Sequence, residues 1–222
     1  MKFRHEYKHC INNADIYCLR SRLRVVMNYD SNCGDDGTYV VKSLYFDNFY
    51  DKALREKIDG VNKREKFRIR YYGNDTSFIR LEKKSKVNGL CFKESVPLTK
   101  EQCTDILCGN REFMAESENS LMREFYAKMK YELLRPKCIV AYTREAYVYP
   151  LGNVRVTFDT NIGVSYNTAN FLNADLQFMK TDKSSILEVK WDEYLPQLIR
   201  DCVQLKGRKS SAFSKYSASR IY

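Results

Sequence analysis

Several segments of this chain alternate charged and apolar residues with the period of a β-strand, and most of the charges are basic. In segment 66–72, Arg68 and Arg70 alternate with aromatic and aliphatic residues. In segment 78–84, a glutamate and two cations alternate in the same way. Successive side chains of a strand point to opposite faces, so each segment predicts a strand with one charged and one apolar face. An ordinary sheet with one solvated face gives the same pattern, so no single segment identifies a binding surface.

The alternating pattern recurs along the whole chain, so the segments taken together are more informative than any one of them. Strands are predicted at 4–10, 38–46, 66–72, 78–84, 90–97, 139–149, 153–159 and 185–191. Helices are predicted at 13–29, 47–58, 99–107, 117–134 and 193–205, which is enough to cover the apolar faces. We therefore predict an α+β fold built on a closed antiparallel β-barrel, a tunnel with a charged lumen and helices packed on its outside.

A lumen of this kind carries an electrostatic cost that restricts what it can contain. Many unpaired cations facing one another would repel strongly, and a long polyanion would offset that repulsion. The carboxylates interspersed among the cations would relieve part of it, or would hold a divalent metal through oxygen ligands.

The composition agrees with a single globular domain spanning 1–222. Lys and Arg number 38 against 28 Asp and Glu, which gives a formal net charge of +10. This charge favours an anionic partner, although a solvated basic surface has the same signature.

The 8 cysteines contain no CxxC pair, which argues against a zinc ribbon. Neither an apolar signal region nor a run of about 18 apolar residues is present, so we expect a cytoplasmic protein with reduced thiols.

Eight short motifs occur in an order that resembles a known family. They are Arg4-His5-Glu6-Tyr7-Lys8, Ser43-Leu44-Tyr45-Phe46-Asp47, Phe67-Arg68-Ile69-Arg70-Tyr71, Leu81-Glu82-Lys83-Lys84, Tyr142-Thr143-Arg144, Val154-Arg155-Val156-Thr157-Phe158-Asp159-Thr160, Leu187-Glu188-Val189-Lys190 and Phe213-Ser214-Lys215-Tyr216. From about Phe3 to Lys215 the chain resembles the VTC domain, the polyphosphate polymerase domain of the vacuolar transporter chaperone complex. That domain belongs to the triphosphate tunnel metalloenzymes, also called CYTH-like proteins.

The resemblance implies a role for each matching side chain. The catalytic cations would be Arg68, Arg70, Arg144 and Arg155. The substrate-binding residues would be Lys8, Lys84, Lys93, Tyr142, Lys190, Ser214 and Lys215, with the last two closing one end of the tunnel. Mn²⁺ or Mg²⁺ would bind at Glu188, Glu6 and Glu82. Other readings stay open: Lys93 could pair with Glu94 at a surface, Tyr142 could be a core ring, and Glu6 and Glu82 could orient cations.

The resemblance implies transfer of the γ-phosphoryl group of ATP to a growing inorganic polyphosphate chain. Such a transfer depends on positioning and charge stabilisation, and the acceptor oxygen is already anionic, so no general base is required. The first alternative is a metal-dependent tripolyphosphatase or nucleoside triphosphatase of the same superfamily. The second is a non-catalytic module that binds RNA or polyphosphate. We expect ATP and polyphosphate as partners, no specific nucleic acid and no membrane segment in this chain, although a separate membrane partner is compatible with the sequence. The oligomeric state is open.

Overall fold

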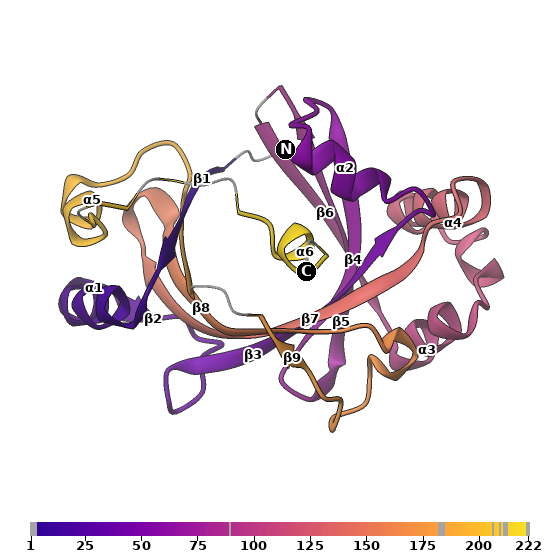
Figure 1. Cartoon of the computed structure of the whole chain (residues 1–222), viewed down its shortest axis with the longest axis horizontal. Coiled ribbons are helices and arrows are strands. Elements are labelled where there is room, and N and C mark those ends of the chain that lie inside the picture. Colours follow the sequence, from indigo (N-terminus) through magenta and orange to yellow (C-terminus); the bar gives the residue numbers. More distant parts are fainter. Residues whose placement is uncertain are drawn as a thin grey trace.

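One antiparallel sheet of ten strands organises the chain in the computed structural model, which describes residues 4–88, 90–181, 185–205, 207–208, 210 and 213–220 (Figure 1). Eight strands follow the order β1-β10-β8-β7-β3-β4-β5-β6, while β2 pairs with β7 and β9 pairs with β8. Their bounds are β1 His5–Ile11, β2 Asn28–Tyr29, β3 Thr38–Asp47, β4 Arg64–Tyr72, β5 Asp75–Val87, β6 Leu90–Leu98, β7 Arg135–Tyr149, β8 Val154–Ser165, β9 Met179–Lys180 and β10 Ser185–Trp191.

The sheet curls into a half-barrel and stays open, so the prediction of a closed barrel was wrong. The edge strands β1 and β6 form no ladder with each other within the described residues, and Figure 1 shows the sheet as an arch with its concave side partly enclosed. A side-chain contact spans the gap, where the Lys84 ammonium lies 2.9 Å from the Glu6 carboxylate. Concave-facing cations lie on both sides of this gap, and their mutual repulsion opposes closer approach of the edges. We call the gap between β1 and β6 the seam.

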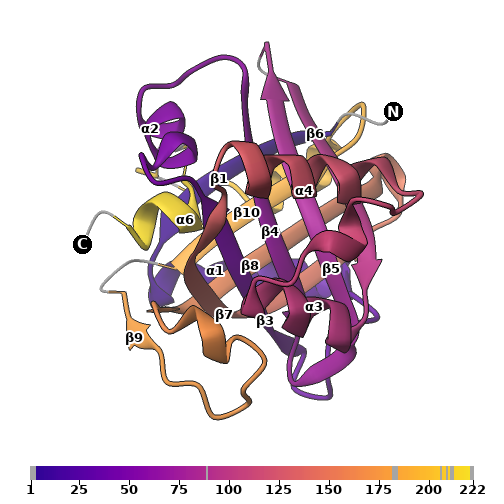
Figure 2. The same cartoon turned by 90° about the vertical axis from the view of Figure 1, so that its right-hand side faces the viewer.

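Four helices cover the convex side of the sheet in two pairs, as predicted. α1 (Asn13–Val26) and α5 (Gln197–Cys202) lie over one half (Figure 1), and α3 (Lys100–Cys108) and α4 (Ser120–Tyr131) lie over the other (Figure 2). Each pair encloses its own apolar core, with Leu19 and Leu23 in the first and Phe125 in the second. Asn12 caps α1 by accepting a hydrogen bond from the backbone N–H of Asp15 at 2.9 Å. No helix in the described part of the chain is long and apolar enough to cross a membrane.

The concave side is charged along only part of its length, whereas we predicted a charged lumen without an apolar section. A third apolar cluster, which includes Tyr45, Val140 and Ile186, occupies the rest. The short helix α6 (Lys215–Ala218) lies inside the curve of the sheet and packs on this cluster (Figure 1). Its Tyr216 ring stacks on Tyr45 with centroids 5.3 Å apart. The tail therefore fills one end of the concave side.

The remaining differences from prediction concern where helices begin and end. α2 (Lys52–Ile58) starts five residues later than expected, because the Asp47 carboxylate stays in the sheet and accepts hydrogen bonds from the backbone N–H groups of Ala53 and Leu54. The predicted helices at 117–134 and 193–205 are shorter, and single 3₁₀ turns form at Glu112–Met114, Leu151–Asn153 and Thr168–Asn170. Phe3, where the resemblance to the VTC domain begins, lies outside the described residues.

Candidate functional site

Strand alternation and register bring the predicted site residues onto the concave face. Lys8 of β1 lies opposite Glu188 of β10, and Glu6 lies opposite Lys190. Lys190 in turn lies opposite Arg155 of β8. On the other half of the sheet, Arg68 of β4 pairs with Glu82 of β5, and Lys84 pairs with Lys93 of β6. The antiparallel register therefore converts separate sequence motifs into neighbouring rows of charge.

One group of ion pairs surrounds Glu82, whose side chain is 3% exposed. Its carboxylate accepts from the Arg68 guanidinium at 2.6 Å and from the Lys93 ammonium at 2.7 Å, and lies 4.0 Å from Arg70. Burial would raise the pKa of Glu82, but Arg68 and Arg70 outweigh it and hold that pKa well below its ordinary value. Glu82 is therefore ionised and keeps two arginines aligned. The partner of Lys93 is Glu82, not Glu94 as the surface alternative proposed.

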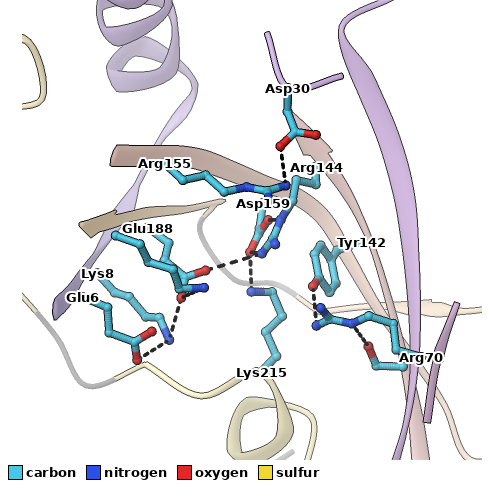
Figure 3. A network of polar contacts seen from close by, with 12 residues as sticks. Glu6, Lys8, Asp30, Arg70, Tyr142, Arg144, Arg155, Asp159, Glu188 and Lys215 are labelled. Carbon is cyan, nitrogen blue, oxygen red and sulfur yellow. Dashed lines mark hydrogen bonds and ion pairs between the residues drawn. The ribbon is translucent and has the colours of Figure 1, made fainter. Parts of the chain in front are cut away.

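A second group of ion pairs surrounds Glu188 and Asp159 (Figure 3). Arg144 donates to the two Asp159 carboxylate oxygens at 2.6 and 2.8 Å and lies 3.5 Å from Glu188. The Lys215 ammonium of α6 bonds to the same aspartate. Lys8 and Lys190 each lie 3.2 Å from Glu188. Arg144, Asp159 and Glu188 are buried, so their pairs are held in a medium that strengthens the attraction, while the three lysines are partly exposed.

Tyr142 joins the two groups. Its hydroxyl accepts a hydrogen bond from Arg70 at 3.3 Å, and its ring lies beneath Lys215 and Arg144, 4.5 and 5.3 Å from the centroid. Burial raises the pKa of this phenol, but Arg144, Arg70 and Lys215 more than compensate and lower it. Tyr142 is 2% exposed, so it belongs to the apolar core as well as to the charged cluster. Its burial agrees with the alternative of a core ring, and contact with phosphate stays a prediction.

Two predicted residues lie apart from this centre. Arg155 reaches toward the loop after β2, where its guanidinium lies 3.1 Å from Asp30 and donates to the Tyr39 hydroxyl at 2.7 Å (Figure 3). Ser214 precedes α6 and caps it, accepting from the backbone N–H of Ser217 at 3.4 Å. Ser214 thus orients the helix that carries Lys215.

A cavity of about 460 Å³ opens beside these ion pairs, at the seam. Of the predicted residues, Glu6, Lys8, Lys84 and Ser214 line it, whereas Arg68, Arg70 and Arg144 do not. The arginines lie deeper on the concave face, because their guanidinium groups are held by buried carboxylates.

The three carboxylates predicted to bind a divalent ion, Glu6, Glu82 and Glu188, are not all in one place. Glu6 and Glu188 share one ammonium, since Lys8 Nζ lies 3.5 Å from the first and 3.2 Å from the second. Two carboxylates around one point are oxygen donors that suit Mg²⁺ or Mn²⁺ together with phosphate oxygens. Glu82 belongs to the other ion-pair group. Across the described residues, no three His, Cys, Asp or Glu side chains are grouped for metal binding. His5 stacks on the Trp191 ring and takes no part.

Sequence reasoning missed several residues of this face. Asp159 was visible only as an alternating charge, although it is fully buried and holds Arg144 and Lys215. Lys66 precedes Arg68 with the same parity and lines the cavity, a position that the strand period could have revealed. Asp30 lies in a loop, where no periodicity marks it.

Comparison with known proteins places this arrangement in a family. The family model described as VTC domain matches residues 3–221. No curated protein sequence matches. Among solved structures, a candidate adenylyl cyclase from Hippeastrum with a dominant triphosphatase activity has 13% identity and a TM-score of 0.57, with 99% of this chain and 95% of that chain covered. A candidate adenylate cyclase from Bacillus halodurans has 13% identity and a TM-score of 0.51, with 86% and 80% covered. These two likenesses concern the fold alone, while the family match spans nearly the whole sequence, so this chain belongs to the VTC domain family.

Proposed function

We propose that this protein is a polyphosphate polymerase that transfers the γ-phosphoryl group of ATP to the end of an inorganic polyphosphate chain. The observation that carries the proposal is the excess of cations gathered on the concave face. Five carboxylates take part in the ion pairs described above: Glu6, Asp30, Glu82, Asp159 and Glu188. Ten cations surround them: Lys8, Lys66, Arg68, Arg70, Lys84, Lys93, Arg144, Arg155, Lys190 and Lys215. A bound polyanion would neutralise the difference.

The arginines would act on the phosphates by position and charge. Arg70 and Arg144 lie on either side of the Tyr142 phenol, and each has a planar fork that matches phosphate oxygens. Carboxylates hold these forks before substrate arrives, so little reorganisation is needed when charge develops on the transferred phosphoryl group. The acceptor is an anionic phosphate oxygen and attacks without a proton acceptor.

Glu6 and Glu188 would hold a divalent ion, Mn²⁺ or Mg²⁺, which would supply further charge neutralisation at phosphate oxygens when bound. Glu82 instead positions Arg68, which is the structural role that the sequence left open for it.

The test compares Arg70→Ala with Arg123→Ala, which removes an exposed arginine from α4 on the convex side. Both variants are incubated with ATP and Mn²⁺ and the products are separated on a polyphosphate gel. Wild-type protein and the control should give a ladder, while Arg70→Ala should lose about a hundredfold or more of the rate and remain folded. Free phosphate without a ladder from the wild type would identify a hydrolase, and full activity of Arg70→Ala would reject the site.

A further inference from the structure

One buried hydroxyl on the concave face takes no part in the ion pairs described above. Thr157 lies in the middle of β8, two residues from Arg155 and two from Asp159, so strand alternation directs all three side chains to the same face. The residue is 3% exposed, and its Oγ1 has no hydrogen-bond partner among the described residues. A buried hydroxyl without a partner lowers stability, so a threonine at this position calls for a reason other than folding.

A second unpaired donor lies beside it on the same strand. Arg155 uses only one end of its guanidinium, because Nη2 both faces Asp30 at 3.1 Å and donates to the Tyr39 hydroxyl at 2.7 Å. Its Nε–H is buried and meets no acceptor within the described part of the chain. An arginine Nε–H can only donate, so whatever satisfies it must be an acceptor.

The cross-strand neighbours of Thr157 do not supply that acceptor. Glu188 of β10 lies directly opposite Thr157, but its carboxylate is shared by Lys8 and Lys190, each at 3.2 Å. Ala146 of β7 lies opposite on the other side and contributes only a methyl group. The hydroxyl and the Nε–H therefore have no acceptor within the sheet that carries them.

The charges around Thr157 indicate what kind of acceptor would fit. Arg144 pairs in register with Asp159, and Lys190 pairs with Arg155, so each cation is a diagonal neighbour of Thr157. Cations on both sides favour an acceptor that carries negative charge. Hydrogen bonds to charged oxygens are also stronger than those to neutral ones. A phosphate oxygen meets both conditions.

We propose that Thr157 is a further substrate-binding residue, whose hydroxyl donates, together with the Nε–H of Arg155, to an oxygen of a phosphate group held between Arg144 and Arg155. The inference rests on the proposed function and adds to it a neutral contact. A threonine in a strand has few side-chain rotamers, so its hydroxyl favours one placement of the phosphate where flexible cations would accept several. Thr157 thus acts through position, while the surrounding residues act through charge.

The test measures binding and does not depend on turnover. Thr157→Val removes the hydroxyl and keeps the branched shape, and Thr157→Ser restores a hydroxyl. The control is Thr143→Val on the opposite face of β7, where the hydroxyl accepts from Asn161 at 3.4 Å. Calorimetry gives the affinity of each protein for tripolyphosphate at low and high salt, in EDTA so that no divalent ion at Glu188 contributes.

We expect Thr157→Val to lose roughly tenfold in affinity, while Thr157→Ser keeps most of it and Thr143→Val binds as the wild type does. Because no charge is removed, the salt dependence of binding by Thr157→Val should equal that of the wild type. Without ligand, Tm of Thr157→Val should be unchanged or higher, because a methyl group replaces an unpaired hydroxyl.

Three results would overturn the proposal. Unchanged affinity of Thr157→Val would show that the hydroxyl does not contact phosphate. A clear fall in its Tm without ligand would show that the hydroxyl has a stabilising partner in the folded protein. A loss of affinity that requires Mn²⁺ and is absent in EDTA would assign the hydroxyl to the metal site. Failure of the proposed function has a different signature, since wild-type protein would then bind no tripolyphosphate, or would bind it and make no polymer.

Discussion

Replacing Asp159 by Asn tests the electrostatic design of the concave face most directly. The side chain is fully buried and bonds to Arg144 through both carboxylate oxygens and to Lys215 of α6. The amide is nearly the same size but carries no charge. Arg144 would keep only Glu188 at 3.5 Å, and Lys215 would lose its ion pair.

The size of the effect follows from burial and from the pKa of the carboxyl. Burial alone would raise the pKa of Asp159, but Arg144 and Lys215 outweigh burial and lower it from 3.8 to about 2. That difference between the folded and unfolded chain corresponds to about 2 kcal/mol of stability at neutral pH. The variant also leaves two buried cations poorly paired, so we expect a loss of about 3 to 5 kcal/mol. For a chain of this length Tm should then fall by roughly 6 to 20 °C.

Thermal and urea unfolding at pH 7 measure this loss, with Glu132→Gln as the control. Glu132 pairs with Lys128 at a site where its side chain is 37% exposed, so its loss should cost less than about 1 kcal/mol. The stabilising contribution of Asp159 is present above pH 3.8 and is lost as the pH falls through about 2, since its folded pKa is the lower one. The gap between wild type and Asp159→Asn should therefore narrow on acidification below pH 4.

Adding tripolyphosphate tests the proposed phosphate site separately from the ion pairs of the ligand-free protein. A phosphate bound at Arg144 would take the place of the missing carboxylate, so the ligand should raise the Tm of Asp159→Asn by more than that of the wild type. A loss below about 1 kcal/mol without ligand would refute the account of the buried pairs. A ligand effect no larger than in the wild type would refute phosphate binding at Arg144.

Two further predictions concern the scaffold. Gly152 has φ +72°, and a Cβ there would collide with the carbonyl oxygen of Tyr194. Gly152→Ala should therefore lower the free energy of unfolding, measured in urea, by about 2 kcal/mol or more. A change of less than about 0.5 kcal/mol would contradict the close approach. Burial raises the pKa of the Cys103 thiol to about 12, whereas Cys18 and Cys108 are exposed, so native protein treated with iodoacetamide should be alkylated at the exposed pair first. Mass spectrometry that finds Cys103 modified as fast as Cys18 would refute this.

The period of two along each strand predicted the faces of the strands well and the overall shape of the sheet poorly. Alternation with period two placed Arg68, Arg70 and Glu82 on one face, and the structure has them on the concave face. The same alternation is compatible with an open or a closed sheet, because it does not specify curvature or what the edge strands pair with. The open seam and its cavity could not be derived from it.

The order of residues was enough to assign side chains to the faces of each strand, because side-chain direction alternates with backbone geometry. It also determined that the concave face would carry more cations than carboxylates. Tertiary structure alone decided which carboxylate meets which cation, such as Asp159 with Lys215, since these partners come from distant segments. It also decided that the tail enters the arch and that the seam stays open, because packing and like-charge repulsion between distant elements leave no periodic trace in the chain.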